Sequence, residues 1–343
     1  MRFNQFQGSR TAFRAAALAL TWLVLISVLH AHLNAERKSS QRIAMGYMPV
    51  VTNLAAPLVD LASKSQDIQF QAIKFASFAE MAEAFRSGHL QVAFIIAPLA
   101  VVMHQQGVPL KVVYIGNRHE STLVGDKNLP TSDLSGLVGK TIAVPIRYSG
   151  HMLALKRYVR QQGLGEDAIR IVEIPPPDMP AAIRTGGIDG FFVGEPFASK
   201  ALRDGTAKRV ADVEQLWPGF ICNLMIVRQE LIDSKPQIVN QLVAAAVKAG
   251  LWAEAHLDEA VRIVSSYWGQ DQDFVRYVFS NPPGRFRFDL YRPEVREMEE
   301  IVLEMRQSGL LTGPVDVAGL VEDRFARSVS GTAVSSIEEI LKN

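Results

Sequence analysis

The sequence has very little cysteine and very little net charge. Cys222 is the only cysteine among 343 residues, so no disulfide can form within the chain. We expect Cys222 to be a buried small hydrophobic residue with no base beside it. With 36 Lys and Arg against 35 Asp and Glu, the formal charge of +1 gives no general attraction to nucleic acid or anionic membranes. Any ligand must therefore be recognised locally.

Motifs for nucleotide cofactors and for nucleophilic catalysis are also missing. No Gly-x-Gly-x-x-Gly fingerprint follows the first predicted strand, and no Gly-x-x-x-x-Gly-Lys-Ser/Thr loop occurs. There is neither a Gly-x-Ser-x-Gly elbow nor a zinc-spaced pair of histidines. Ser149 and His151 are two residues apart at a predicted helix start, so their side chains point in different directions. We predict a binding protein without catalytic residues, cofactor or metal.

Residues 1–35 have the layout of a secretory signal. Arg10 and Arg14 precede an uncharged apolar run over residues 15–29, and small or polar residues follow up to Ala35. This layout predicts export to the periplasm, with cleavage after Ala35. The run is short for a membrane span, which needs about 20 residues. An uncleaved N-terminal anchor that retains the protein at the inner membrane is the alternative.

The rest of the chain alternates between predicted strands and helices. Short apolar runs rich in β-branched residues are each followed by a capping residue and a run with helical spacing. The predicted strands cover residues 42–45, 70–75, 92–96, 111–115, 141–144, 171–174 and 188–193. This alternation is typical of an α/β fold with parallel, doubly wound sheets. Helices are predicted over residues 236–255 and 257–268, and the residues after Ser328 are polar enough to form a loose tail.

Two stretches of the sequence resemble crossings between lobes. The polar stretch 125–135 separates two groups of strand and helix units, and a return crossing is expected near residues 220–227. The chain is therefore predicted to form a discontinuous lobe I from residues 36–125 and 223–343, with lobe II, residues 126–222, inserted in it. A hinge that closes the cleft at the crossings is the expected mechanism.

A polar cluster follows the predicted strand at residues 141–144. Ser149 is predicted as the N-cap of the next helix, and Gly150 allows close backbone approach. The N–H groups of a helix N-terminus attract anions and carbonyls, and His151 could donate a hydrogen bond to the same ligand. A capped surface helix with a surface histidine would explain the same pattern.

A second transition places Glu195 directly after the predicted strand at residues 188–193. A carboxylate at the C-terminal end of a buried strand lies where open α/β sheets bind ligands. Glu195 could instead cap the next helix, which Pro196 begins.

Arg285 and Arg287 alternate with two phenylalanines, as in a short extended segment with both arginines on one face. Guanidinium groups match the geometry of carboxylates and oxyanions, so this pair could address an anionic ligand. The alternative is that the arginines are solvated or paired with Asp289 and Glu294.

The segments PPPDM at residues 175–179 and DGFFVGEP at residues 189–196 resemble the substrate-binding proteins of nitrate and bicarbonate ABC transporters. Those proteins belong to a larger nitrate/sulfonate/taurine and thiamine-precursor binding family. Ser149 and His151 match the Ser-x-His element of the nitrate type. The resemblance is sharpest between residues 137 and 222.

The resemblance implies a two-lobe type II periplasmic-binding-protein fold with mostly parallel sheets and a hinge. Such a protein is exported, clamps a small solute such as a nitrate- or bicarbonate-like anion or a sulfonate, and delivers it to an ABC permease in the membrane. Nucleic acid is not an expected partner, and a monomer is the family expectation. In the family the loop after the first strand lines the cleft, which makes Thr52 and Asn53 candidates. The resemblance and the helix starts together give these candidate ligand-binding residues: Thr52, Asn53, Ser77, Ser149, Gly150, His151 and Glu195.

Two departures bear on the ligand and on the function. Nitrate-type proteins carry a tryptophan near Ser77, where this chain has Phe78, and a phenyl ring cannot donate a hydrogen bond to an anion. Glu195 would repel a pure anion unless one of the two is protonated or bridged. A ligand sensor, soluble or membrane-anchored, is an alternative function on the same fold. A thiamine-pyrimidine-type enzyme is disfavoured, because that type uses a cysteine-rich iron site.

Overall fold

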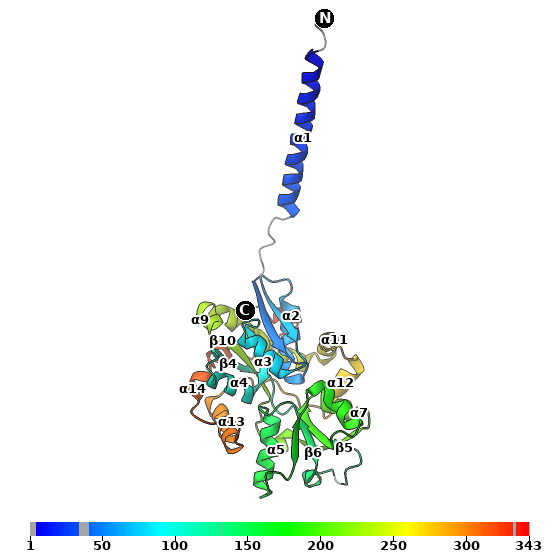
Figure 1. The fold of residues 1–343 in the computed structure, drawn as a ribbon, viewed down its shortest axis with the longest axis vertical. Coiled ribbons are helices and arrows are strands. Elements are labelled where there is room, and N and C mark those ends of the chain that lie inside the picture. Colours follow the sequence, from blue (N-terminus) through cyan, green and yellow to red (C-terminus); the bar gives the residue numbers. More distant parts are fainter. Residues whose placement is uncertain (1–4, 34–40, 131, 332–333, 343) are drawn as a thin grey trace. The chain divides into compact units, whose positions relative to one another are not determined.

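The computed structural model describes residues 5–33, 41–130, 132–331 and 334–342. The chain divides into two units, residues 1–41 and 42–343. The first unit is built on the long helix α1 (Gln5–Leu33), which Figure 1 shows in blue. Its apolar side chains between Phe13 and Leu29 are exposed. No helix in the described part of the chain is both long and apolar enough to cross a membrane. The cleavage site predicted after Ala35 lies outside the described residues.

The described residues of the second unit form two five-stranded sheets (Figure 1). In spatial order, the first sheet contains β2 (Ile68–Lys74), β1 (Gln41–Tyr47), β3 (Val92–Ile96), β10 (Asn223–Arg228) and β4 (Leu110–Ile115). The second contains β7 (Arg170–Glu173), β6 (Thr141–Val144), β8 (Gly190–Gly194), β5 (Ser121–Asp126) and β9 (Ala207–Asp212). We call the parts built on these sheets lobe I and lobe II.

Each sheet is mixed, and its antiparallel strand follows a crossing between the lobes. The pairs β1–β3, β6–β7 and β6–β8 are parallel. Strand β10 is antiparallel to both β3 and β4, and β5 is antiparallel to both β8 and β9. The predicted α/β fold with two lobes is thus confirmed, while these two antiparallel strands were not predicted.

The first crossing lies at residues 116–120, and the prediction at residues 125–135 was wrong. The reason is β5, which begins at Ser121 with two polar residues and already belongs to the second sheet. The return crossing reaches β10 at Asn223, within the predicted range. Arg118 and Ile221 form an antiparallel bridge, so the two crossings run side by side.

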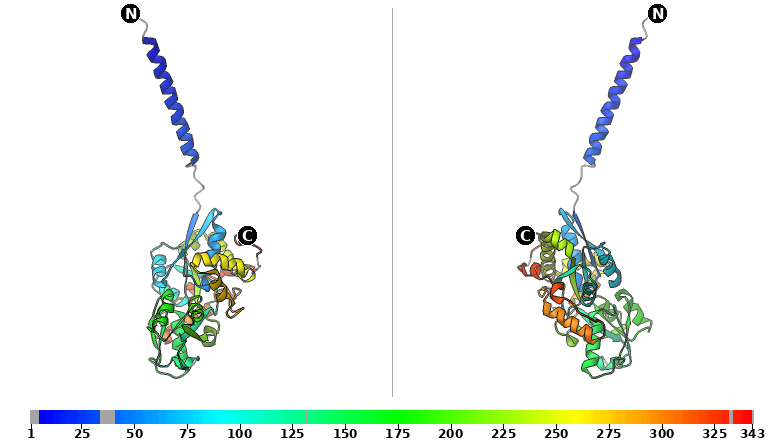
Figure 2. Two further views of the ribbon diagram at one scale, coloured as in Figure 1. Left: turned by 90° about the vertical axis from the view of Figure 1, so that its right-hand side faces the viewer. Right: turned by 60° about the vertical axis from the view of Figure 1, so that its left-hand side comes forward.

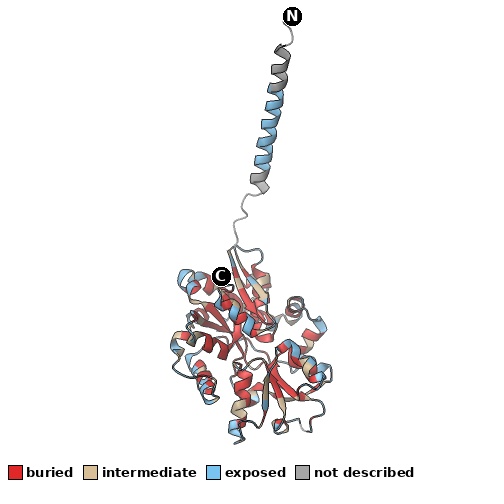
Figure 3. Ribbon diagram, viewed as in Figure 1, coloured by how far each residue is buried: buried red, intermediate tan, exposed pale blue. Residues whose placement is uncertain are grey.

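Helices cover both sheets, and they bury apolar stripes against the strands (Figures 2 and 3). Lobe I carries α2 (Ala55–Ser63), α3 (Phe78–Arg86), α4 (Ala97–Gln105), α9 (Gln229–Ser234), α10 (Pro236–Ala255), α11 (Leu257–Trp268), α12 (Gln272–Ser280), α13 (Val295–Gln307), α14 (Val317–Leu320) and α15 (Arg324–Arg327). Lobe II carries α5 (Gly150–Gln161), α6 (Met179–Arg184), α7 (Phe197–Arg203) and α8 (Val213–Leu216). The helices predicted over residues 236–255 and 257–268 are confirmed as α10 and α11.

Two apolar clusters form the core. One lies within lobe I and includes side chains of α2, α10 and α11. The other is continuous from α3 and α4 of lobe I into lobe II, where it includes Met152 and Phe192. Ile337, Ile340 and Leu341 are buried in the first cluster, so the prediction of a loose tail after Ser328 was wrong. Apolar side chains spaced three and four residues apart hold this segment against lobe I.

Candidate functional site

The start of α5 is built by Ser149 and Gly150. Ser149 has an extended backbone, and its Oγ accepts a hydrogen bond from the Met152 N–H at 3.2 Å, which confirms the predicted N-cap. A Cβ added to Gly150 would lie 2.6 Å from the Phe220 ring. Only glycine therefore lets α5 approach the return crossing this closely. The first-turn N–H groups of α5 consequently lie beside the crossings.

His151 is buried, so the alternative of a surface histidine was wrong. Its side chain is 1% exposed, and its Nε2 lies 2.9 Å from the Ser121 Oγ. The Phe192 ring packs edge-on against the imidazole at 5.0 Å. Burial lowers the pKa of His151 to about 3, which makes the imidazole neutral at neutral pH. Its Nδ1 has no hydrogen-bond partner among the described residues.

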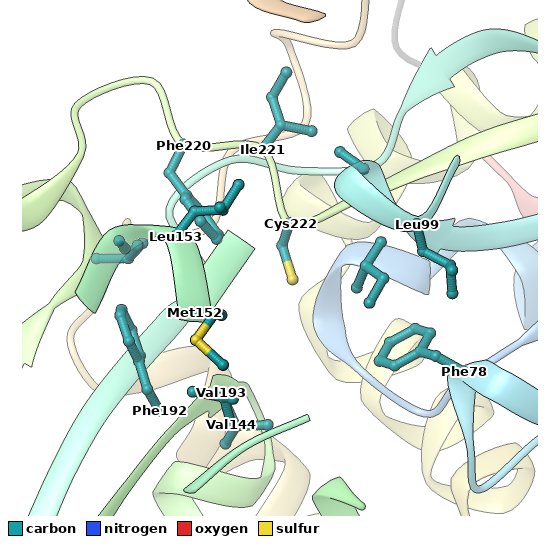
Figure 4. Packing of buried hydrophobic residues seen from close by; sticks show 14 of the residues in the cluster. Phe78, Leu99, Val144, Met152, Leu153, Phe192, Val193, Phe220, Ile221 and Cys222 are labelled. Carbon is teal, nitrogen blue, oxygen red and sulfur yellow. The ribbon is translucent and has the colours of Figure 1, made fainter. Parts of the chain in front are cut away.

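Cys222 lies between the two lobes. It is buried, as predicted, but the expectation that no base lies beside it was wrong, because its Sγ is 4.0 Å from the His151 Nε2. Figure 4 shows the sulfur directed between Met152 of lobe II and Phe78 of lobe I. Burial and the neighbouring Glu120 carboxylate raise the pKa of the Cys222 thiol, so the thiol stays protonated.

On the lobe I side, Thr52 and Asn53 belong to the 3-10 turn Val51–Asn53. Neither side chain caps α2, because Leu54 lies between this turn and the helix and occupies the N-cap position. Asn223 instead connects them, since its Nδ2 donates to the Thr52 Oγ1 at 2.9 Å and to the Asn53 Oδ1 at 3.0 Å. All three residues are buried.

Glu195 is fully buried, and both of its carboxylate oxygens are occupied. One accepts from the Thr122 Oγ1 at 2.9 Å and the other from the Ser199 N–H at 2.8 Å. The second bond lies in the first turn of α7, so Glu195 serves the start of that helix, the alternative that the sequence left open. Its backbone carbonyl accepts from the Val51 N–H at 2.9 Å and so joins lobe II to lobe I. Burial raises the pKa of Glu195.

Glu120 is a second buried carboxyl group, which sequence reasoning missed. Its Oε2 accepts from the Glu195 N–H at 2.7 Å. A Cβ added to Gly194 would lie 2.5 Å from the Glu120 Oε1, so the glycine makes room for this carboxyl group. Burial raises the pKa of Glu120 to about 7.

The structure brings six of the seven predicted residues to the junction of the lobes. A chain of contacts runs from Thr52 and Asn53 through Asn223, Cys222, His151, Ser121 and Thr122 to Glu195. We call this set the interlobe cluster. Ser149 and Gly150 adjoin it at the start of α5. Ser77 instead accepts from the Ala79 and Glu80 N–H groups and caps α3.

The interlobe cluster offers hydrogen-bonding groups within an apolar surround. Phe78, Leu99 and Met152 lie around it and are 5–7% exposed. Among the described residues, no group of three or more His, Cys, Asp or Glu side chains is arranged to hold a metal ion. The hydroxyl, amide and imidazole groups of the cluster, beside the helix N-terminus of α5, can bind a ligand reversibly through hydrogen bonds.

Sequence reasoning missed Glu120, Ser121, Thr122 and Asn223. Glu120 directly precedes β5, Ser121 and Thr122 open that strand, and Asn223 opens β10. A polar residue at a strand end usually faces solvent. Their burial follows from the packing of one lobe against the other. One local signal was available, because polar residues precede both apolar runs that follow the crossings.

Comparison with known proteins identifies related sequences. A model of the NMT1-like family matches residues 36–266. The taurine-binding periplasmic protein of Escherichia coli K12 is 31% identical over 181 residues, which are 51% of this chain and 55% of that protein. The nitrate/nitrite binding protein NrtA of Synechococcus elongatus is 27% identical over 208 residues, 59% of this chain and 45% of that protein. The chain thus spans about half the length of the curated relatives it matches.

Solved structures share the fold. The periplasmic nitrate-binding protein NrtA from Synechocystis superposes with a TM-score of 0.76 at 14% identity, covering 84% of this chain and 87% of that one. At this identity the likeness concerns the fold alone, which is that of a periplasmic binding protein.

Proposed function

The chain belongs to the NMT1-like family, and we propose that it is a solute-binding protein of an ABC importer. In this proposal it binds a small solute between lobes I and II and delivers it to a permease in the membrane. The interlobe cluster carries the proposal, because its hydrogen-bonding side chains come from both lobes and from the return crossing. A ligand held there contacts both lobes at once, as a hinge-closing binding protein requires.

We infer that the solute combines a polar head with an apolar part, as an aliphatic sulfonate or taurine does. The neutral imidazole of His151 and the N–H groups at the start of α5 suit an oxyanion without a full opposing charge. Phe78, Leu99 and Met152 supply apolar contacts that a bare nitrate ion would not use. Burial raises the pKa of Glu195, which weakens its repulsion of an anion, and both of its oxygens are engaged within lobe II.

The site residues proposed to contact the solute are Thr52, Asn53, Ser149, Gly150 and His151. We assign Glu195 and Ser77 to supporting roles, because the first serves the start of α7 and the second caps α3.

Location and partners follow from the same proposal. We propose that the protein works in the periplasm as a monomer, with residues 1–35 acting as an export signal or as an anchor at the inner membrane. A permease is the macromolecular partner. A ligand sensor on the same fold is the alternative, and it would bind the solute without stimulating transport by a permease.

An enzymatic role is not supported by the state of the thiol. A nucleophilic cysteine needs a lowered pKa and a base that accepts its proton. Burial raises the pKa of Cys222 and lowers that of His151, so both groups are neutral. The curated relatives described above are themselves named as binding proteins.

The function is tested by a thermal-shift panel with nitrate, nitrite, bicarbonate, taurine and methanesulfonate. A ligand at about a thousand times its dissociation constant adds roughly 4 kcal/mol and shifts the melting temperature by several degrees. We expect taurine or methanesulfonate to give this shift. A shift with nitrate alone would contradict the inferred solute class, and silence across the panel would contradict the proposed ligand set.

Two serine variants form a matched test of the site. Ser149→Ala and Ser77→Ala each remove an N-cap hydroxyl, so each should lower the unfolding free energy by about 1 kcal/mol. Only Ser149→Ala should also weaken binding of the ligand found in the panel, by about tenfold for one lost hydrogen bond. Isothermal titration measures both affinities. Equal affinities would remove the start of α5 from the site.

A further inference from the structure

Arg285 is a buried arginine that the site described above leaves unused. Its side chain is 4% exposed, and it lies in the segment between α12 and α13. Phe286 and Phe288, which follow it in the chain, are buried in the apolar cluster of lobe I. A Cβ added to Gly250 of α10 would lie 2.6 Å from Phe288, which shows how closely this segment packs there. The backbone of Arg285 is therefore fixed to lobe I.

The guanidinium group of Arg285 reaches into lobe II. One nitrogen donates to the Thr122 Oγ1 at 2.7 Å, and the other donates to the Ser121 carbonyl at 2.6 Å. The same group lies 3.1 Å from a carboxylate oxygen of Asp212 and 3.3 Å from one of Glu214. These four partners come from β5, β9 and α8, all in lobe II. Arg285 thus joins the lobes beside the interlobe cluster.

Its two partners on β5 are the residues that hold His151 and Glu195. The Ser121 Oγ lies 2.9 Å from the His151 Nε2, and the Thr122 Oγ1 donates to Glu195. Arg285 is therefore linked to His151 through Ser121 and to Glu195 through Thr122. Its charge also lowers the pKa of the buried Glu195 carboxyl group, although burial raises this pKa by more.

We propose that Arg285 is a positioning residue, which fixes the start of β5 under His151 and Glu195 and holds the two lobes in the closed arrangement. The expected effect of Arg285 on ligand affinity rests on the proposed function. Its expected effect on lobe closure does not, because closure can be measured without a ligand. A buried arginine is stable only when it is paired. Removing it leaves Asp212, Glu214, the Thr122 hydroxyl and the Ser121 carbonyl without the group that holds them against lobe I.

Arg287 provides a matched control from the same segment. Its side chain is 68% exposed, and it pairs with Asp289 two residues away. The alternative that both arginines pair with nearby acidic residues thus describes Arg287 and not Arg285. Replacing Arg287 removes the same charge from the same segment without touching lobe II.

Lobe closure is measured through Cys222, the only cysteine of the chain. The thiol is buried between the lobes, so alkylation by N-ethylmaleimide reports the fraction of time that the lobes are open. Without ligand, Arg285→Met should be alkylated at least about tenfold faster than the wild type. The alkylation rate of Arg285→Lys should lie between these two, because lysine keeps the charge but not the two guanidinium nitrogens that donate to β5. Arg287→Met should be alkylated at the rate of the wild type.

Low urea concentrations separate lobe opening from global unfolding, since a rate that does not change with urea reports local opening. Should Arg285→Met fail to fold, the double variant Asp212→Asn and Glu214→Gln removes the partners from the lobe II side, and it should be alkylated faster too. Equal alkylation rates for the wild type, the Arg285 variants and the double variant would overturn the proposal.

Affinity is measured separately, with taurine as the probe. If taurine binds the wild type, Arg285→Met should weaken binding by about tenfold or more, Arg285→Lys less, and Arg287→Met not at all. Unchanged affinity in Arg285→Met would overturn the positioning role. Failure of taurine to bind the wild type would count against the proposed solute, while the alkylation rates would still decide the role of Arg285 in closure.

Discussion

Glu120 and His151 are buried titratable residues whose pKa values are shifted in opposite directions by the same cause. Burial disfavours the charged form of each, so it raises the pKa of Glu120 to about 7 and lowers that of His151 to about 3. Both groups are consequently neutral over much of the acidic range. Each contributes a pH dependence to stability, and the two dependences have opposite signs.

For Glu120 the folded protein binds a proton more tightly than the unfolded chain. The contribution of this proton binding to the unfolding free energy is therefore fully present below pH 4.5 and is lost as the pH rises to about 7. Glu120→Gln should remove this dependence, on the order of 3 kcal/mol across that interval. Urea unfolding of both proteins at pH 4.5, 6 and 7.5 measures it. A constant difference between the two proteins at all three pH values would contradict the buried, protonated carboxyl group.

The sequence predicted the helix-start residues well and the strand-start residues poorly. Ser149 was found because an N-cap has a local signature, a serine before a run with helical spacing. Glu120 and Asn223 were not found, since their burial depends on contacts between segments about 75 and 170 residues apart in the chain, Glu195 with Glu120 and Asn223 with Thr52. Local patterns carry no information about such contacts.

At the scale of elements, the end of β4 is fixed by a close backbone approach. Gly116 follows β4 directly, and a Cβ added to it would lie 1.8 Å from the Thr52 carbonyl oxygen. This oxygen belongs to the 3-10 turn that carries Thr52 and Asn53. Because a backbone atom cannot rotate away, the glycine is required for the turn and the first crossing to meet.

Gly116→Ala should therefore lower the unfolding free energy by at least about 2 kcal/mol, because either the 3-10 turn or the first crossing must move to make room for the added methyl group. Gly165→Ala is the matched control, because an added Cβ there has no atom within 4 Å and the backbone needs no left-handed conformation. That variant should be neutral or slightly stabilising. Denaturant unfolding measures both, and equal stabilities would show that the turn can shift without cost.

The seven strands and two helices predicted from the sequence lie within about two residues of the observed elements. Strand β3 and helices α10 and α11 have the predicted bounds, because each is a strongly patterned apolar segment. Strand β5 was missed. It begins with two polar residues and ends in a turn, so its pattern resembles a linker more than a strand. That error moved the predicted crossing by about ten residues.

At the scale of the whole second unit, α13 joins the lobes at a charge cluster with α5. The Glu304 carboxylate pairs with Arg157 at 3.2 Å and with Arg160, while Glu300 pairs with Arg157 at 2.9 Å. Helix α13 also packs against α4 of lobe I, and the right-hand view of Figure 2 shows it in orange beside the green α5. The Arg157 guanidinium in addition lies over the Trp217 ring.

The two glutamates of this cluster differ in burial, since the side chain of Glu304 is 9% exposed and that of Glu300 is 46% exposed. Glu304→Gln should lower the unfolding free energy by about 1–3 kcal/mol, a reduced value because both arginines are partly exposed. Glu300→Gln should cost at most about 1 kcal/mol. Denaturant unfolding tests the ranking, and a larger loss in Glu300→Gln would contradict it.

The position of β10 also determines when each lobe can be completed during synthesis. All strands of lobe II lie within residues 121–212, whereas the sheet of lobe I has β10 between β3 and β4. A chain that emerges from its N-terminus has made four strands of lobe I before it makes any of lobe II, yet these four cannot close into one sheet. Lobe II can therefore complete its sheet first, while the earlier strands of lobe I keep unpaired edges until β10 is made.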